Sequence, residues 1–133
     1  RPNSRYVADF VGTSNFFNGT LTDDKDALAT VRLDNGMPMQ GRPGGNLAKG
    51  QDVCISVRPE QMKLHRVGDG LSVEVHNRIF LGEHTEYLVK HESLGDFLVL
   101  SPRQYEQAEG PFNAGDSALV SWEPSAALIL DHT

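Results

Sequence analysis

Residues 71–91 read LSVEVHNRIFLGEHTEYLVKH and give the clearest structural signal in the chain. Two runs rich in Val, Ile, Leu and Thr, 71–81 and 83–91, meet at Leu81-Gly82-Glu83. Because glycine tolerates a positive φ, this tripeptide is typical of the turn between two antiparallel strands. The stretch therefore predicts a β-hairpin near the middle of the chain.

Short β-rich runs bounded by Gly, Asn, Asp and Pro continue on both sides of this hairpin. Helical periodicity is confined to 4–12, where Ser4 supplies the N-cap and Gly12 the stop, and to a short turn at 101–109. Many short strands without alternating helices predict an all-β small barrel or sandwich. The further strands expected are 16–22, 27–34, 52–58, 96–100, 117–122 and 126–130.

Two glycine-rich stretches interrupt the strands. Residues 36–50 contain five glycines and two prolines, which predict a loop. The second break, Val67-Gly68-Asp69-Gly70, predicts a division into lobes at about 13–66 and 71–133.

The composition is that of an ordinary globular chain of one compact domain or two small lobes, with 38% hydrophobic and 23% charged residues. The net charge of −6 and the scattered Lys and Arg side chains argue against a general nucleic-acid binder. No apolar run approaches the ~20 residues that span a bilayer, so membrane association is expected only through a protein partner. Cys54 alternates with apolar residues and is expected to be a buried, inert thiol.

The motifs of common catalytic sites are incomplete or missing. Gly45 and Gly50 have the glycine spacing of a P-loop, but Gln51 and Asp52 stand where Lys and Ser or Thr are required. The five histidines show no zinc-like spacing, and no Gly-x-Ser-x-Gly elbow is present. We therefore expect no catalytic residue, no cofactor site and no metal site.

Two stretches are candidates for binding or interface roles. GTSNFFNG at 12–19 places Ser and Asn directly before two phenylalanines, and 57–60 places opposite charges around a proline that ends a strand. The candidate ligand or interface residues are Ser14, Asn15, Gly19, Arg58 and Glu60. The residues expected to be structural are Phe10, Phe16, Pro59 and Trp122.

These stretches, in this order, resemble the tail of one subfamily of ABC-importer ATPases. Residues 1–12, RPNSRYVADFVG, match a segment of the type Arg-Pro-x-x-x-Phe-Val-Ala-x-Phe-Ile-Gly that opens a β-rich domain of the TOBE type. Tyr6 and Val11 are mild departures that keep shape and polarity. Further matches are GQDV at 50–53, SVRPE at 56–60, IFLG at 79–82, TEYLV at 85–89, GDSALVSWEP at 115–124 and ALIL at 127–130.

The resemblance implies an OB-like, two-lobed barrel at 13–133, preceded at 1–12 by the end of a linker helix from an ATPase domain. It implies a non-catalytic regulatory and dimerisation domain, cytoplasmic and peripheral to the inner membrane through its complex. ATP and magnesium belong to the other domain, and without an initiator methionine the chain is expected to be part of a longer one. The partners implied are a second copy, the membrane-spanning permease subunits through the parent chain, and a regulatory protein or small ligand. Polyamine-type importers are slightly favoured.

Two other functions stay open at this point. The string Ser14-Asn15 followed by Gly19 also resembles the molybdate-binding relatives of this fold, which use backbone amides and short polar side chains. Nucleic-acid binding would need exposed aromatic platforms in a basic groove. The available aromatics are Phe80, Tyr87, Phe97 and Trp122, mostly at positions that pattern as core, in an acidic chain.

Overall fold

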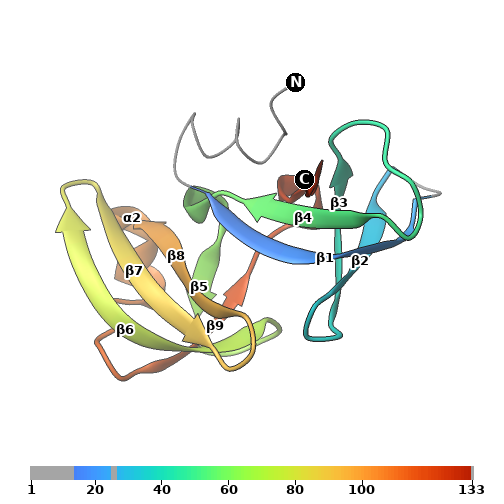
Figure 1. Cartoon of the computed structure of the whole chain (residues 1–133). Coiled ribbons are helices and arrows are strands. Elements are labelled where there is room, and N and C mark those ends of the chain that lie inside the picture. The colour runs from blue at the N-terminus through green and yellow to red at the C-terminus, as the bar shows by residue number, and fades with distance from the viewer. Residues whose placement is uncertain (1–13, 25–26, 133) are drawn as a thin grey trace. The chain divides into compact units, whose positions relative to one another are not determined.

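The computed structural model describes residues 14–24 and 27–132 (Figure 1). The described chain forms two compact units. Unit 1 contains residues 14–58 and returns for 123–132, whereas unit 2 is the continuous stretch Pro59–Trp122. The expected helix at 4–12, and Phe10 within it, lie outside the described residues.

Unit 1 is a closed barrel with the strand order β1-β2-β3-β10-β4. β4 pairs with β1 and so closes the barrel, and β10 runs parallel to β3 but antiparallel to β4. A 3₁₀ turn, η2 (Pro124–Ala126), precedes the last strand. The strands are β1 (Asn15–Asp23), β2 (Ala29–Leu33), β3 (Pro38–Pro43), β4 (Asp52–Val57) and β10 (Leu128–Asp131).

The barrel core follows from the alternation of side chains along each strand. In β1 the buried positions alternate from Asn15 through Phe17 to Leu21, and β4 and β10 contribute Ile55 and Ile129. Gly19 belongs to the same inward-facing row, directly opposite Leu33 of β2. A Cβ at Gly19 would lie 2.7 Å from Val31 Cγ1 and closer still to backbone, so the packing of β1 on β2 requires a glycine here.

The loop expected at 36–50 is only partly correct, because Pro38–Pro43 forms strand β3. This strand pairs with β2, placing Gly41 opposite Ala29, and its far end lies beside β10. Its two prolines stand at the first and last strand positions, where a missing amide costs least. The pairing comes from partners distant in sequence, and it overrides the local preference of glycine and proline for loops.

Unit 2 is a five-stranded sheet with the order β5-β9-β6-β7-β8 and a helix beside it. Each neighbouring pair is antiparallel. Its elements are η1 (Pro59–Gln61), β5 (Lys63–His65), β6 (Leu71–Leu81), β7 (His84–His91), β8 (Gly95–Pro102), α2 (Arg103–Glu109) and β9 (Ser117–Ser121).

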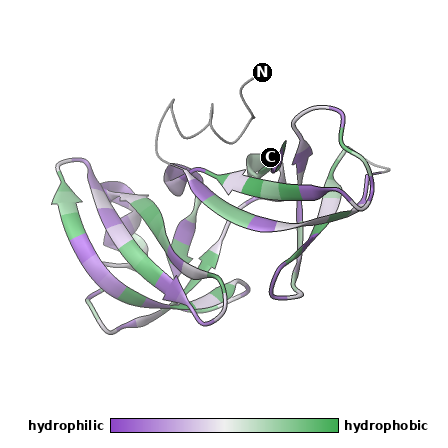
Figure 2. Ribbon diagram, viewed as in Figure 1, coloured by the Kyte–Doolittle hydropathy of each residue, from purple (hydrophilic) through white to green (hydrophobic). Residues whose placement is uncertain are grey.

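The central hairpin of unit 2 joins β6 and β7 through Gly82, whose φ of +74° lies in the left-handed region that favours glycine. Buried and more exposed positions alternate along β7 and along the first half of β6, and Figure 2 shows hydrophobic and hydrophilic segments on both strands. Val75, Val89 and Tyr87 are fully buried on one face of the sheet. A β-bulge between Val75 and Asn77 interrupts the register of the pair.

The predicted all-β class with an OB-like barrel is confirmed. The expected strand 71–81 has the observed bounds, and the helical turn expected at 101–109 is α2. The division into units differs from the expected one, because residues 123–132 return to the first barrel instead of completing the second lobe. Within the described ranges, no helix is long and apolar enough to cross a membrane.

Candidate functional site

Three of the sequence-predicted candidates come together at one end of the β1–β4 ladder. Ser14 directly precedes β1, and its hydroxyl lies 2.6 Å from that of Ser56 in β4. Asn15 is buried and stands opposite Val57, the last residue of β4, after which Arg58 follows. Short polar side chains therefore gather where β1 begins and β4 ends.

The other predicted ligand or interface candidates, Gly19 and Glu60, are not part of this end of the ladder. Gly19 sits in the middle of β1 and is required by packing, as described above. Pro59 is buried at the start of η1, and Arg58 and Glu60 on either side of it are exposed. Phe16 is half-buried in β1.

Trp122, expected to pack within a strand, lies one residue beyond the end of β9 and is half-buried. The expected strand 117–122 is therefore one residue too long. Of the other aromatics considered for base stacking, Tyr87 and Phe97 are buried, whereas Phe80 is 56% exposed.

A buried polar cluster that no sequence motif indicated ties α2 to the sheet of unit 2. Glu106 of α2 is only 8% exposed. Its Oε1 accepts a hydrogen bond from Thr85 Oγ1 at 2.5 Å, and its Oε2 accepts one from the Tyr87 hydroxyl. The Tyr87 oxygen in turn accepts a hydrogen bond from the Phe112 amide at 3.2 Å. In sequence, Glu106 is one of several Glu and Gln residues in a polar segment.

The electrostatics of this cluster favour a neutral tyrosine. Burial, followed by the hydrogen bond to Glu106, raises the pKa of Tyr87 to about 12. The phenol therefore stays protonated throughout the physiological range and donates to Glu106, which ties α2 to the sheet.

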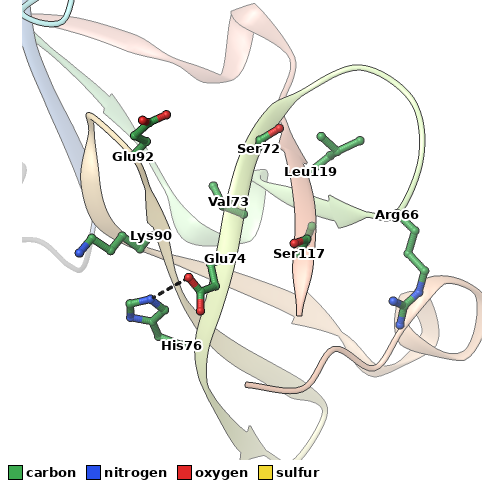
Figure 3. Close-up of a pocket in the computed structure, with 10 residues that line it drawn as sticks. Arg66, Ser72, Val73, Glu74, His76, Lys90, Glu92, Ser117 and Leu119 are labelled. Carbon is green, nitrogen blue, oxygen red and sulfur yellow. Dashed lines mark ion pairs between the residues drawn. The ribbon is translucent and has the colours of Figure 1, made fainter. Parts of the chain in front are cut away.

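The exposed face of the unit 2 sheet carries a shallow hollow of about 600 Å³ (Figure 3). Its lining mixes cationic and anionic side chains. Glu74 and Lys90 are cross-strand partners, and His76 Nε2 lies 3.8 Å from Glu74 Oε1. His76 lies two residues after Glu74 and therefore shares its exposed face, at the β-bulge between Val75 and Asn77. Opposite charges at neighbouring positions favour a solvated polar face over a site that selects one sign of ligand.

A match to a known domain family covers all of unit 2 and the parts of unit 1 that flank it in the sequence. The TOBE domain family matches residues 55–130, more than half of the sequence, from within β4 to the end of the buried part of β10. The chain belongs to the TOBE domain family. The resemblance stated from the motifs is thereby confirmed.

Two import ATP-binding proteins are similar to this TOBE chain over nearly its whole length. The spermidine/putrescine import ATP-binding protein PotA 1 of Pseudomonas aeruginosa is 34% identical over 98% of this chain and 35% of that protein. The spermidine/putrescine import ATP-binding protein PotA of Rubrobacter xylanophilus is 30% identical over 97% of this chain and 34% of that protein. The TOBE chain thus spans about a third of the length of the curated relatives it matches.

Among solved structures, the cytoplasmic molybdate-binding protein ModG with molybdate bound has the same fold. The two superpose with a TM-score of 0.75 over 89% of this TOBE chain and 96% of that chain. Their sequence identity is 15%, so this likeness establishes the fold alone.

Proposed function

We propose that this TOBE domain is the non-catalytic regulatory and self-association part of the ATP-binding subunit of an ABC importer, with polyamines as the transported class. The observation that carries the proposal is the alignment of 98% of the chain with a spermidine/putrescine import ATP-binding protein at 34% identity. In this proposal the domain lies on the cytoplasmic side, with the permease subunits as partners of the parent chain.

The hydrogen bonds of Gln51, directly after the glycine-rich loop 36–50, support the proposal that ATP is bound by another domain of the parent chain. Gln51, which stands where a P-loop has its lysine, accepts a hydrogen bond from the Ala48 amide at 2.9 Å through its Oε1. Its Nε2 donates to Asp131 of β10 at 3.0 Å. The Gln51 side chain thus connects the loop to the barrel. It also accepts from the Ala48 amide, which in a phosphate-binding loop would have to donate to the phosphate. Equilibrium dialysis with millimolar ATP and magnesium should show no specific binding, and a saturable micromolar site would contradict this interpretation.

The proposed role acts through surfaces. If two copies of the domain stay together, each holds the ATPase domain of its own subunit at a high effective concentration beside the other. A ligand or protein that prefers one arrangement of the pair then shifts the equilibrium of the ATPase domains by its differential affinity.

A chimera tests the proposal in a working transporter. The matching third of the Pseudomonas aeruginosa relative is replaced by this chain, and spermidine uptake is compared with that of the protein lacking this third. The matched control carries the corresponding segment of the Rubrobacter xylanophilus relative, which is 30% identical to this chain. We expect both chimeras to restore uptake. Recovery with the control segment but not with this chain would overturn the proposal.

A second candidate function, an oxyanion-binding module, has one observation in its favour. The hydroxyls of Ser14 and Ser56 meet at 2.6 Å beside the buried Asn15, which is the kind of short polar chemistry that holds oxyanions without a net positive charge. The fold is also that of a protein described as molybdate-binding. Calorimetric titration with molybdate, tungstate and sulfate distinguishes the two candidates. Saturable heat that is lost in Ser14→Ala would favour the oxyanion module.

Nucleic acid has no place in the proposal, because two of the four aromatic residues considered for base stacking are buried. A salt-dependent shift with single-stranded DNA would contradict this.

A further inference from the structure

Helix α2 has few local interactions that stabilise it. It has 7 residues, and no side chain caps its first turn. Isolated helices shorter than ~12–15 residues are only marginally stable in water. Among the side chains of α2 that the structure describes, Glu106 alone is buried, and Tyr105 is half-buried and donates to the Leu64 carbonyl at 2.8 Å. An element with so few buried apolar side chains opens more easily than the sheet beside it.

The attachment of α2 to the neighbouring strands β7 and β8 is mainly polar (Figure 1). The Glu106 carboxylate accepts hydrogen bonds from the hydroxyls of Thr85 and Tyr87, which lie on the same face of β7. Thr85 and its cross-strand partner Ser101 on β8 are each 2% exposed. Water can hydrogen-bond all of these groups once the helix moves away, so opening leaves no buried polar group without a partner.

One side of α2 borders an open hollow of about 620 Å³. Phe80 of β6 lines it from the strand side, and Arg103, Glu106 and Gln107 line it from the helix. Phe80 is 56% exposed, so its ring does not seal the helix against the sheet. Glu106 therefore lies at the boundary between the buried hydroxyl groups and the hollow.

The chain on both sides of α2 is attached to the sheet by other contacts. Before the second residue of the helix, the Arg103 amide donates to the Glu83 carbonyl at 2.8 Å. After the helix, Phe112 is 2% exposed, and the Arg78 guanidinium donates to its carbonyl at 3.1 Å. Residues 104–110 can therefore move away from the sheet while both of their ends stay attached.

We propose that residues 104–110 form a lid that opens as a unit while the sheet of unit 2 stays folded, and that the Glu106 carboxylate holds it closed. The open state exposes the hydroxyls of Thr85, Tyr87 and Ser101. A ligand or protein that binds these hydroxyls shifts the populations of the two states by its differential affinity. The lid is a property of unit 2 alone, so its failure would leave the proposed importer function untouched.

Hydrogen exchange of the whole chain, followed peptide by peptide in increasing urea, tests the lid. The helical amides include that of Gly110, which donates to the Glu106 carbonyl at 3.0 Å. We expect these amides to exchange at least about a hundredfold faster than those of β7, with a weak urea dependence, because local opening exposes little surface. Equal rates and equal urea dependence in the two segments would overturn the proposal, since α2 would then open only with the whole unit.

Glu106→Gln tests the role of the carboxylate, because it keeps the size of the side chain but replaces one acceptor oxygen with a donor. Losing a hydrogen bond to a charged group should raise exchange in the lid at least about tenfold. Thr85→Val removes one hydroxyl donor and should give a smaller rise, which keeps the test decisive if Glu106→Gln does not fold. Gln104→Ala is the matched control, because Gln104 is exposed on the same helix, and it should change exchange by less than about twofold. Equal effects of the carboxylate variant and the control would overturn the assignment of Glu106.

A buried thiol measures the opening by a different reaction. Ser101→Cys places a thiol beside the lid, whereas the natural Cys54 is fully buried in unit 1. Adding Glu106→Gln should speed the reaction of the thiol at position 101 with an aromatic disulfide reagent at least about tenfold and leave that of Cys54 unchanged. An equal acceleration at both thiols would show that the substitution loosens the whole chain, and would overturn the lid.

Discussion

Replacing Tyr87 with phenylalanine removes one hydroxyl from the centre of unit 2 and leaves the shape of the side chain unchanged. In the structure this hydroxyl donates to Glu106 Oε2 and accepts the Phe112 amide proton. Tyr87→Phe therefore leaves two polar groups without this hydrogen-bond partner, the Glu106 carboxylate oxygen and the Phe112 amide. The ring itself keeps its edge-on contact with Phe112, at 5.9 Å between centroids.

The expected cost follows from those two groups. A buried donor or acceptor left without its partner costs about 1–3 kcal/mol, so two would cost about 2–6 kcal/mol. Glu106 also lines the hollow beside α2, where water can reach the carboxylate. We therefore expect Tyr87→Phe to lower the free energy of unfolding by about 2–4 kcal/mol.

The assay is urea unfolding at pH 7, monitored through the fluorescence of Trp122, the only tryptophan of the chain. Tyr105→Phe is the control, because the half-buried Tyr105 donates to the Leu64 carbonyl at 2.8 Å. Its loss should cost about 0.5–1.5 kcal/mol. If the two substitutions cost the same, Tyr87 and Glu106 do not form the buried connection described here.

Three further outcomes are expected. Because the pKa of Tyr87 is raised, the unfolded chain loses this proton near pH 10 and the folded chain near pH 12. The free energy of unfolding, measured by urea unfolding, should therefore fall between these pH values in the wild type and fall less in Tyr87→Phe. Gly19→Ala should destabilise by about 1–3 kcal/mol, because its Cβ would collide with the backbone of β2; an unchanged melting temperature would refute this. Arg58→Ala should change the unfolding free energy by less than about 1 kcal/mol, since Arg58 is exposed; a larger loss in urea unfolding would show that this side chain supports the fold.

Local sequence patterns were sufficient wherever a strand and its turn are neighbours in the chain. The hairpin of 71–81 and 84–91 was predictable because β-rich runs flank a glycine that the turn requires. β3 was not, because its six residues have the composition of a loop and become a strand only between β2 and β10. β5, with three residues, is too short to show a period.

The candidate sites show the same limit. Ser14 and Arg58 could be singled out as unusual residues, but only the β1–β4 register brings them to the same end of the barrel. The role of Glu106 depends on where α2 packs, which no local pattern reports. The exposure of Ile79, Phe80 and Leu81 was equally hidden, since apolar residues earlier in the same strand, Val73 and Val75, are buried.

The chain order of unit 1 has a consequence for synthesis. β3 and β4 can pair with β10, which lies between them in the barrel, only after β10 has been synthesised. The whole of unit 2 is synthesised after β4 and before β10. Residues 59–122 can therefore complete their sheet on the ribosome while the first barrel is still an open four-stranded ribbon with two unpaired edges. A stop between Trp122 and Leu128 should yield a folded second unit attached to an aggregation-prone first one.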